Sequence, residues 1–123
     1  MNTVILMGRF VEDPELSSYK TEDGKGTRAV FTLAVQREGK DAGADFIRCI
    51  SFGKRADFIG QYFEKGQRCL VSGSWRTGSY ENKDGEKVYT NDCIISSIEF
   101  ADSKKLNDGF EDDEAPRGKA RRR

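Results

Sequence analysis

Short runs of β-branched and aromatic residues, separated by glycine, aspartate, asparagine and lysine, dominate the first 100 residues of the chain. Such runs are typical of strands in an all-β domain. A glycine at position 8 interrupts the first run, which indicates a bulge or a close approach between two backbones. Asp13-Pro14-Glu15 ends that run, and residues 20–26 are expected to form a polar connection. The pattern predicts five strands, at residues 3–10, 27–36, 45–52, 68–77 and 86–100.

One segment has the spacing of a helix instead. Between residues 54 and 65, apolar side chains recur at intervals of three or four positions, and a lysine and a glycine end the pattern. This spacing and this stop signal predict one amphipathic helix. Its apolar positions are Ala56, Ile59, Tyr62 and Phe63.

The predicted elements follow in the order of three strands, one helix and two strands. This order fits a five-stranded Greek-key barrel of the OB type, in which one helix between the third and fourth strands closes an end of the barrel. The last two strands are joined through Asp84-Gly85, which is a strong signal for a hairpin turn. The sequence therefore predicts an all-β OB fold, with another small barrel or a β-sandwich as the alternative.

The length of 123 residues leaves room for one hydrophobic core. The longest strongly apolar run, Val4-Ile5-Leu6-Met7, is too short to cross a bilayer, and no basic leader segment precedes it. We therefore expect a soluble cytoplasmic protein. The same run is either a core strand or a strand covered on both sides, and the second alternative would place it at a subunit interface.

The charges balance over the whole chain, with 21 basic and 21 acidic residues, so no net field attracts the protein to a polyanion. They are most sharply segregated near the C-terminal end. The acidic residues between Asp108 and Glu114 precede the basic residues between Arg117 and Arg123. We expect residues 1–104 to form the domain and residues 105–123 to form a disordered charged tail.

Cysteine and histidine usage limits the chemistry. Cys49, Cys69 and Cys93 lack the spacing of a zinc site or a disulfide framework and are expected to be buried thiols. Because the chain has no histidine, imidazole acid–base catalysis and histidine-ligated metals are excluded. The carboxylates and glycine-rich connections match no catalytic, metal or phosphate-loop pattern. The sequence thus predicts no enzyme and no cofactor, and a Mg²⁺-dependent nuclease is the least favoured alternative.

Alternation along the strands groups aromatic and basic side chains on one face. The residues that share this face of strand 45–52 are Phe46, Arg48, Ile50 and Phe52. On the following strand, the same period groups Arg76 with Tyr80 and sets Trp75 on the opposite face. Lys54 and Arg55 follow directly, and residues 46–56 and 65–80 contain basic residues but no acidic ones.

Aromatic rings beside guanidinium groups suit a single-stranded nucleic acid, because each unpaired base offers a π-face and each linkage a phosphate. Such a surface tolerates any base sequence. The alternative is that Phe46 and Phe52 form the core while Arg48 extends along it to solvent, and that Tyr80 only packs on the surface. An arginine within a core face would be unusual, which favours exposure.

Several motifs occur in a characteristic order. They are Val4-Ile5-Leu6-Met7-Gly8-Arg9, Asp13-Pro14-Glu15-Leu16, Phe31-Thr32-Leu33-Ala34-Val35, Ala44-Asp45-Phe46-Ile47-Arg48-Cys49-Ile50-Ser51-Phe52-Gly53-Lys54, Gly66, and Gly73-Ser74-Trp75-Arg76-Thr77. In this order and spacing, the chain resembles bacterial-type single-stranded DNA-binding proteins, including those encoded by phages and plasmids. The resemblance covers about residues 1–100.

The resemblance implies an OB fold that assembles as a homotetramer, with the first strand at a subunit interface and DNA wrapped over the assembly. It implies base stacking on Phe46, Phe52 and Tyr80. The basic residues that it would place near phosphates are Arg48, Lys54, Arg55, Arg76, Arg9 and Arg37. The implied role is to coat and protect single-stranded DNA in replication, recombination and repair, in the nucleoid. An OB-fold adaptor of primosome assembly or replication restart is the alternative.

Two features depart from that family. The connection Arg37-Glu38-Gly39-Lys40 has no aromatic residue where the family commonly has one, so one stacking site is expected to be missing. Family members also typically end in an acidic tip closed by hydrophobic residues, which recruits other genome-maintenance proteins, whereas this chain ends in Arg121-Arg122-Arg123. The acidic segment from Asp108 to Glu114 is either an internal version of that tip or a solubilising stretch.

Overall fold

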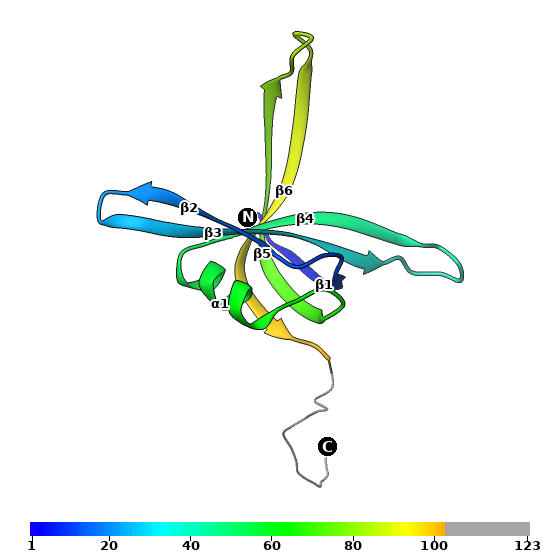
Figure 1. Ribbon diagram of the computed structural model, residues 1–123. Helices are drawn as coiled ribbons and strands as arrows, with labels where there is room; N and C mark the ends of the chain where they lie inside the picture. Colours follow the sequence, from blue (N-terminus) through cyan, green and yellow to red (C-terminus); the bar gives the residue numbers. More distant parts are fainter. Residues whose placement is uncertain (103–123) are drawn as a thin grey trace, which may run out of the picture.

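The computed structural model describes residues 1–102, in which six strands and one helix follow one another (Figure 1). The predicted tail at 105–123 and the predicted domain boundary lie outside the described residues. The elements are β1 (Val4–Phe10), β2 (Glu15–Thr21), β3 (Gly24–Gln36), β4 (Ala44–Phe52), α1 (Lys54–Tyr62), β5 (Arg68–Glu81) and β6 (Lys87–Phe100).

The strands form a closed barrel with the predicted Greek-key order. Neighbouring strands follow in the order β1-β5-β6-β4-β3, and β1 closes the ring because Arg9 and Phe10 also pair with β3. All of these pairs are antiparallel except β4 and β6, which run parallel and place Cys49 opposite Cys93. The all-β OB fold with one helix between two of its strands is therefore confirmed.

The strand β2 differs from the prediction of five strands. We expected a polar connection at residues 20–26, but β2 and the first part of β3 form an antiparallel hairpin there, in which Thr21 lies opposite Gly24. Both β1 and β2 pair with β3, on either side of the segment that contains Pro14. Because proline has no backbone N–H to donate, the pairing is interrupted there, and β1 and β2 behave as two halves of one bent strand.

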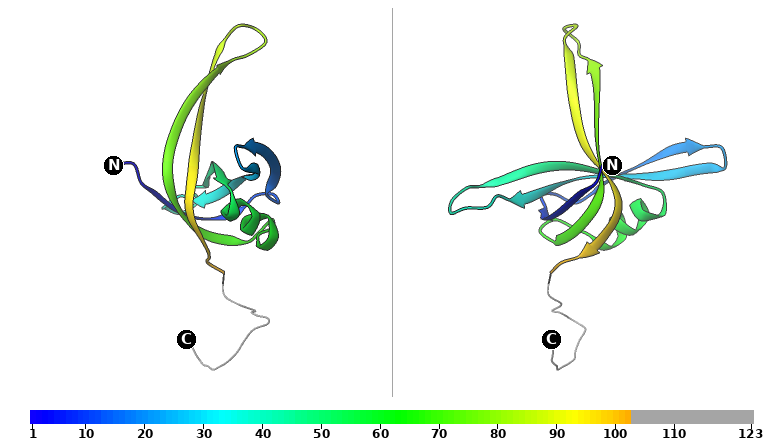
Figure 2. Two further views of the ribbon diagram at one scale, coloured as in Figure 1. Left: turned by 90° about the vertical axis from the view of Figure 1, so that its left-hand side faces the viewer. Right: turned by 180° about the vertical axis from the view of Figure 1, so that it is seen from behind.

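The helix α1 closes one end of the barrel (Figure 1, Figure 2) and buries Ala56 and Ile59. It ends at Tyr62, three residues earlier than predicted, because Phe63 adopts an extended backbone conformation. The Phe63 ring turns into the core and stacks on Phe10, with ring centroids 5.2 Å apart. Phe10 in turn stacks on Phe31 at 4.5 Å, so rings from β1, from β3 and from the residue after α1 fill this end of the barrel.

All three cysteines are buried free thiols, as predicted. Burial raises the pKa of Cys69 to about 12, and it raises the pKa values of Cys49 and Cys93 above the ordinary thiol value. Because the thiolate is the reactive form, all three cysteines are inert packing residues at neutral pH. Within the described residues, no helix has the length and apolar character needed to cross a membrane.

Three hairpin arms extend from the barrel in different directions. They are formed by β2 with β3, by β3 with β4, and by β5 with β6 (Figure 1), and the same arms are seen from behind in Figure 2. The predicted turn at Asp84-Gly85 closes the β5–β6 arm, where the backbone N–H of Gly85 donates to the carbonyl of Asn82 at 3.0 Å. The arms carry the outward face of the sheet well beyond the barrel.

Candidate nucleic-acid interface

The outward face of β4 carries the aromatic residues that alternation selected. Phe46 is 66% exposed and Phe52 is 40% exposed, whereas Cys49 and Ser51 on the other face are buried in the barrel. The alternative in which Phe46 and Phe52 form the core is therefore wrong. Ile50 shares their face but is only 6% exposed, because it lies between Val30 of β3 and Ile94 of β6.

The β5–β6 arm continues this face. Tyr80 is 57% exposed, and Arg76 is exposed on the same side of β5. Trp75 turns to the opposite side, where it packs against the core and its indole Nε1 donates to the side-chain oxygen of Asn91 at 3.3 Å. The separation of Trp75 from Tyr80 agrees with the alternation along this strand.

A carboxylate lies between two arginines at the centre of the face. Arg48 of β4 donates from Nη1 to Oδ1 of Asp92 at 3.0 Å, and Asp92 on β6 lies directly opposite Arg76 of β5. The ion pair fixes one end of the Arg48 guanidinium group, whose other donors stay available because the side chain is about half exposed. Asp92 was not identified from the sequence.

Lys54 and Arg55 begin α1, directly beyond the Phe52 end of β4. Both are exposed, and Arg55 donates from Nη1 to the backbone carbonyl of Ile95 at 3.4 Å. Neither residue has an acidic partner in the ion pairs of the described chain. They add two positive charges next to Phe52.

Arg37 is engaged within the β3–β4 arm. Its Nε and Nη2 donate to the same oxygen of Asp45, at 3.0 and 2.8 Å. These hydrogen bonds hold the pKa of Asp45 below its ordinary value and raise the pKa of Arg37. Because Asp45 directly precedes Phe46, the ion pair between Arg37 and Asp45 ties together the two ends of the connection between β3 and β4, next to the exposed Phe46 ring.

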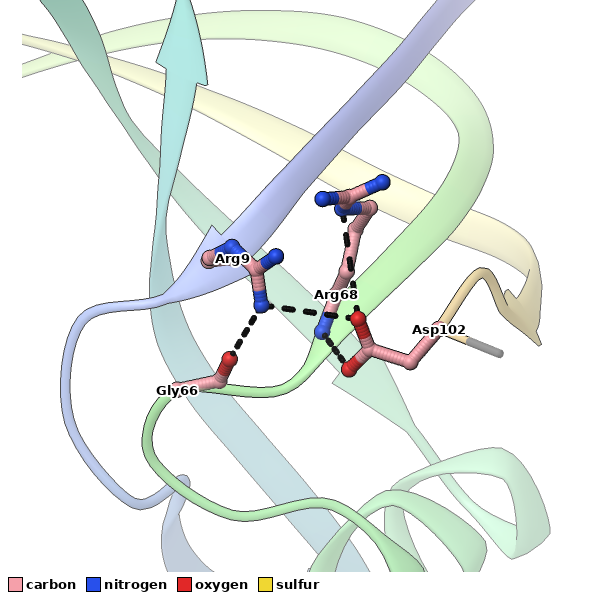
Figure 3. Close-up of polar contacts among 4 residues, drawn as sticks. All are labelled: Arg9, Gly66, Arg68 and Asp102. Carbon is pink, nitrogen blue, oxygen red and sulfur yellow. Dashed lines mark hydrogen bonds and ion pairs between the residues drawn. The ribbon is translucent and has the colours of Figure 1, made fainter. Parts of the chain in front are cut away.

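Arg9 lies at the end of β1, in a separate cluster of polar groups (Figure 3). Its Nη1 donates to the carbonyl of Gly66 at 2.9 Å and pairs with Asp102 at 3.4 Å. The other oxygen of Asp102 accepts the backbone N–H of Arg68 at 2.8 Å. Arg9 is opposite Ala34, which in turn is opposite Phe46, so Arg9 reaches the outward face two strands away from Phe46.

Two residues that were missed from the sequence, Tyr19 and Arg28, join the Phe52 end of the face. Arg28 of β3 lies directly opposite Phe52. The Tyr19 ring of β2 meets Phe52 edge to face, with centroids 5.8 Å apart and planes at 89°. Asp23-Gly24, a turn signal like Asp84-Gly85, could have identified this hairpin.

The arrangement gathers aromatic rings and arginines on the outward surface of β2, β3, β4, β6 and β5. We call this surface the aromatic–basic face. It is defined by Tyr19, Arg28, Phe46, Arg48, Phe52, Arg76, Tyr80 and Asp92. Tyr19, Arg28 and Asp92 are half-buried there, and the other members are exposed. Flat rings accept bases on their π-faces, and guanidinium groups pair with phosphates.

Comparison with known proteins identifies the family. Residues 1–101 match the model of the single-strand binding protein family. The chain is 51% identical over 115 residues to a single-stranded DNA-binding protein of Clostridium perfringens, a match that covers 89% of this chain and 75% of the relative. It is 41% identical over 116 residues to single-stranded DNA-binding protein 1 of Staphylococcus aureus strain Mu50, a match that covers 91% of this chain and 72% of the relative. A single-stranded DNA-binding protein of Fusobacterium nucleatum is 40% identical over 110 residues, with coverage of 85% and 69%. The chain therefore belongs to the single-strand binding protein family.

Proposed function

We propose that this protein binds single-stranded DNA irrespective of base sequence, and that it coats and protects the strand in replication, recombination and repair. The observation that carries the proposal is the exposure of Phe46, Phe52 and Tyr80 on one face with Arg48 and Arg76. The names of the curated relatives support the same function. The proposal attributes no catalysis to the chain, and it places the protein in the nucleoid.

The physical basis of this binding is stacking combined with ion pairing. An unpaired base stacks on an aromatic side chain whatever its identity, and each such contact is worth about 1–3 kcal/mol. Arginine side chains pair with the phosphates that connect the bases, which makes the affinity depend on salt. Duplex DNA hides its base faces within the helix, so it can use only the second of these interactions.

The direct test is competition between single-stranded and duplex DNA. A labelled dT oligomer bound to the protein should be displaced efficiently by unlabelled dT but poorly by a duplex of equal length. An equal effect of both competitors would contradict the proposal and favour the OB-fold adaptor. Degradation of a labelled single strand in the presence of Mg²⁺ would instead indicate a nuclease.

We predict that Arg76→Ala flattens the salt dependence of binding. Each phosphate neutralised on a single strand contributes about −0.7 to the slope of log affinity against log salt, so the loss of one contact should reduce the slope by about that amount. Lys87→Ala is the matched control, because Lys87 lies on the same arm but over the ring of Tyr89, on the opposite side from Arg76. Titrations at four or more salt concentrations measure both slopes. Equal slopes for the wild type and Arg76→Ala would remove Arg76 from the interface.

We propose further that the chain assembles as a homotetramer through β1. On its outward side, β1 exposes Ile5 and Met7, and its partner β5 adds the half-buried Leu70. Apolar side chains in a row on a sheet support burial against a second copy. This face accounts for one contact between subunits, and the tetramer requires a second.

The corresponding prediction is that Ile5→Asp reduces the mass of the protein in solution. A carboxylate at the centre of an apolar contact would be buried without a partner, which costs several kcal/mol. Sedimentation velocity of the free protein measures the change, with Tyr89→Ala as a control at another exposed apolar residue. An unchanged tetramer in Ile5→Asp would exclude β1 as the contact, and a wild-type monomer would exclude the assembly.

The acidic segment from Asp108 to Glu114 lies outside the described residues. That it recruits replication and repair proteins stays a prediction from the family resemblance. Deletion of residues 107–123, followed by pull-down with purified replication proteins, would test it.

A further inference from the structure

The β2–β3 arm has two distinct sides. On the inner side, Ala29 is buried, and Leu16 packs so closely on α1 that a side chain at Gly60 would overlap it. The outer side carries Tyr19, opposite Gly26, and Arg28, opposite Ser17. Because side chains on paired strands point the same way at paired positions, Tyr19 and Arg28 face the same side as Phe52. The arm thus extends the aromatic–basic face beyond the barrel.

The Tyr19 ring is held in place on this arm. It lies over Gly26, where an added Cβ would come within 2.5 Å of its Cζ and 2.7 Å of its hydroxyl oxygen. Its other contact is the edge-to-face packing on Phe52 at 5.8 Å. The ring is therefore fixed between a bare stretch of backbone and an exposed aromatic residue. A ring that is already ordered loses little conformational entropy when a ligand binds to it.

The three arms are equivalent in one respect. The β3–β4 arm carries Phe46 on the aromatic–basic face, the β5–β6 arm carries Tyr80, and the β2–β3 arm carries Tyr19. Each arm also has a basic residue on or beside that face, and on the β2–β3 arm this residue is Arg28. The connection that follows Arg37 contains no aromatic residue. For a bound DNA strand that continues beyond Phe52, the next ring along the surface is therefore Tyr19.

We propose that the β2–β3 arm is an additional binding site for single-stranded DNA, at which one base contacts Tyr19 and the adjoining phosphate pairs with Arg28. This inference rests on the proposed function and extends the path of the strand from Phe52 outward along the arm. Tyrosine contributes a ring face to any base and a hydroxyl that donates or accepts a hydrogen bond. The site therefore adds length and affinity without adding base specificity.

Affinity measurements with dT oligomers of increasing length test the proposal. Tyr19→Ala should weaken the binding of long oligomers about 5- to 150-fold, which corresponds to one lost stacking contact. Oligomers too short to continue beyond Phe52 should show a much smaller change. Tyr19→Phe keeps the ring and should retain most of the affinity. Tyr89→Ala is the matched control, because Tyr89 is an exposed tyrosine on the opposite side of the β5–β6 arm from Tyr80.

A second readout separates DNA contact from an indirect effect on Phe52. Photocrosslinking of the wild type to a dT oligomer that contains 5-iododeoxyuridine should label the peptide that holds Tyr19, and a merely structural role would not produce this label. The inference is overturned if the wild type binds dT but Tyr19→Ala binds equally at all lengths and the peptide stays unlabelled. It is also overturned if Tyr19→Ala weakens all lengths equally without crosslinking. Failure of the wild type to prefer dT over duplex would instead reject the proposed function.

Discussion

Replacement of Phe46 and Phe52 together by alanine is expected to lower the affinity for a dT oligomer by about 2–6 kcal/mol at fixed salt. Under the proposed function each ring provides one base-stacking contact, and each such contact is worth about 1–3 kcal/mol. Phe46 is largely exposed, whereas Phe52 is 40% exposed and packs edge to face on Tyr19. Removal of both rings therefore leaves the barrel core intact and the variant folded, but it should lower the free energy of unfolding by about 1–2 kcal/mol through the lost aromatic pair. The loss is therefore a loss of binding. Fluorescence anisotropy of a labelled oligomer measures it, and circular dichroism monitors the fold.

The matched control for this double variant is Tyr89→Ala. Tyr89 is also an exposed aromatic residue, but its side chain lies under Lys87 on the other side of its arm. Its removal should leave the affinity within about threefold of the wild type. The loss in the double variant should be similar for dT, dA and dC oligomers, because stacking does not depend on hydrogen-bonded readout of the bases. A folded double variant with wild-type affinity would show that DNA does not use this face.

The barrel strands could be predicted from the sequence because their signal is local. A period of two in apolar side chains places alternate residues inside and outside a sheet, whatever the neighbouring strands are. The strand β2 carries almost no such signal, since most of its residues are polar, nearly all are exposed, and its leucine and tyrosine do not alternate. Its conformation depends on pairing with β3, which supplies a backbone partner for each residue from Glu15 to Thr21. A strand whose conformation depends on its pairing partner cannot be identified from alternation in its own sequence.

The helix end shows a related effect of the tertiary structure. The apolar spacing of Tyr62 and Phe63 extended the predicted helix to residue 65. In the structure, Phe63 leaves the helix so that its ring can stack on Phe10 and on Phe100, the latter at 4.3 Å. Contacts with residues more than 35 positions away thus decide where the helix ends. Local spacing alone does not contain this information.

The candidate site was predictable in part for the same reason. The position of Arg48 between two aromatic residues indicated that the face of β4 is exposed, and this inference used only one strand. The ion pair between Arg48 and Asp92 joins residues 44 positions apart and depends on the parallel contact of β4 with β6. The burial of Ile50 could be predicted only from the topology, since alternation places this residue on the outward face and residues of neighbouring strands cover it. The face on which a side chain lies can be predicted from the sequence of one strand, whereas its contact partners depend on how the strands are arranged in the fold.

Gly73→Ala is expected to have the largest effect on stability, because Gly73 lies at a close contact between β5 and β6. A Cβ at Gly73 would overlap the carbonyl oxygen of Ile94 and lie 3.1 Å from the Cα of Ile95. Both atoms belong to the backbone of β6, next to the irregular pairing at Ser72 and Gly73, so no side-chain rotation can relieve the overlap. We expect the variant to lose about 3 kcal/mol of unfolding free energy, measured by urea denaturation at constant protein concentration.

Gly78→Ala on the same strand separates this clash from a general effect of alanine in place of glycine. The nearest atom to a Cβ at Gly78 is the Oγ1 of Thr90 at 3.0 Å, which a rotation of the threonine side chain moves away. The change in stability should therefore stay within about 1 kcal/mol, because alanine also reduces the entropy of the unfolded chain. If Gly73→Ala folds, β5 and β6 must separate at the base of their arm, which displaces Arg76 from Asp92 and should weaken DNA binding as well. A Gly73→Ala variant with the urea midpoint and DNA affinity of the wild type would contradict both the close approach and its role in the aromatic–basic face.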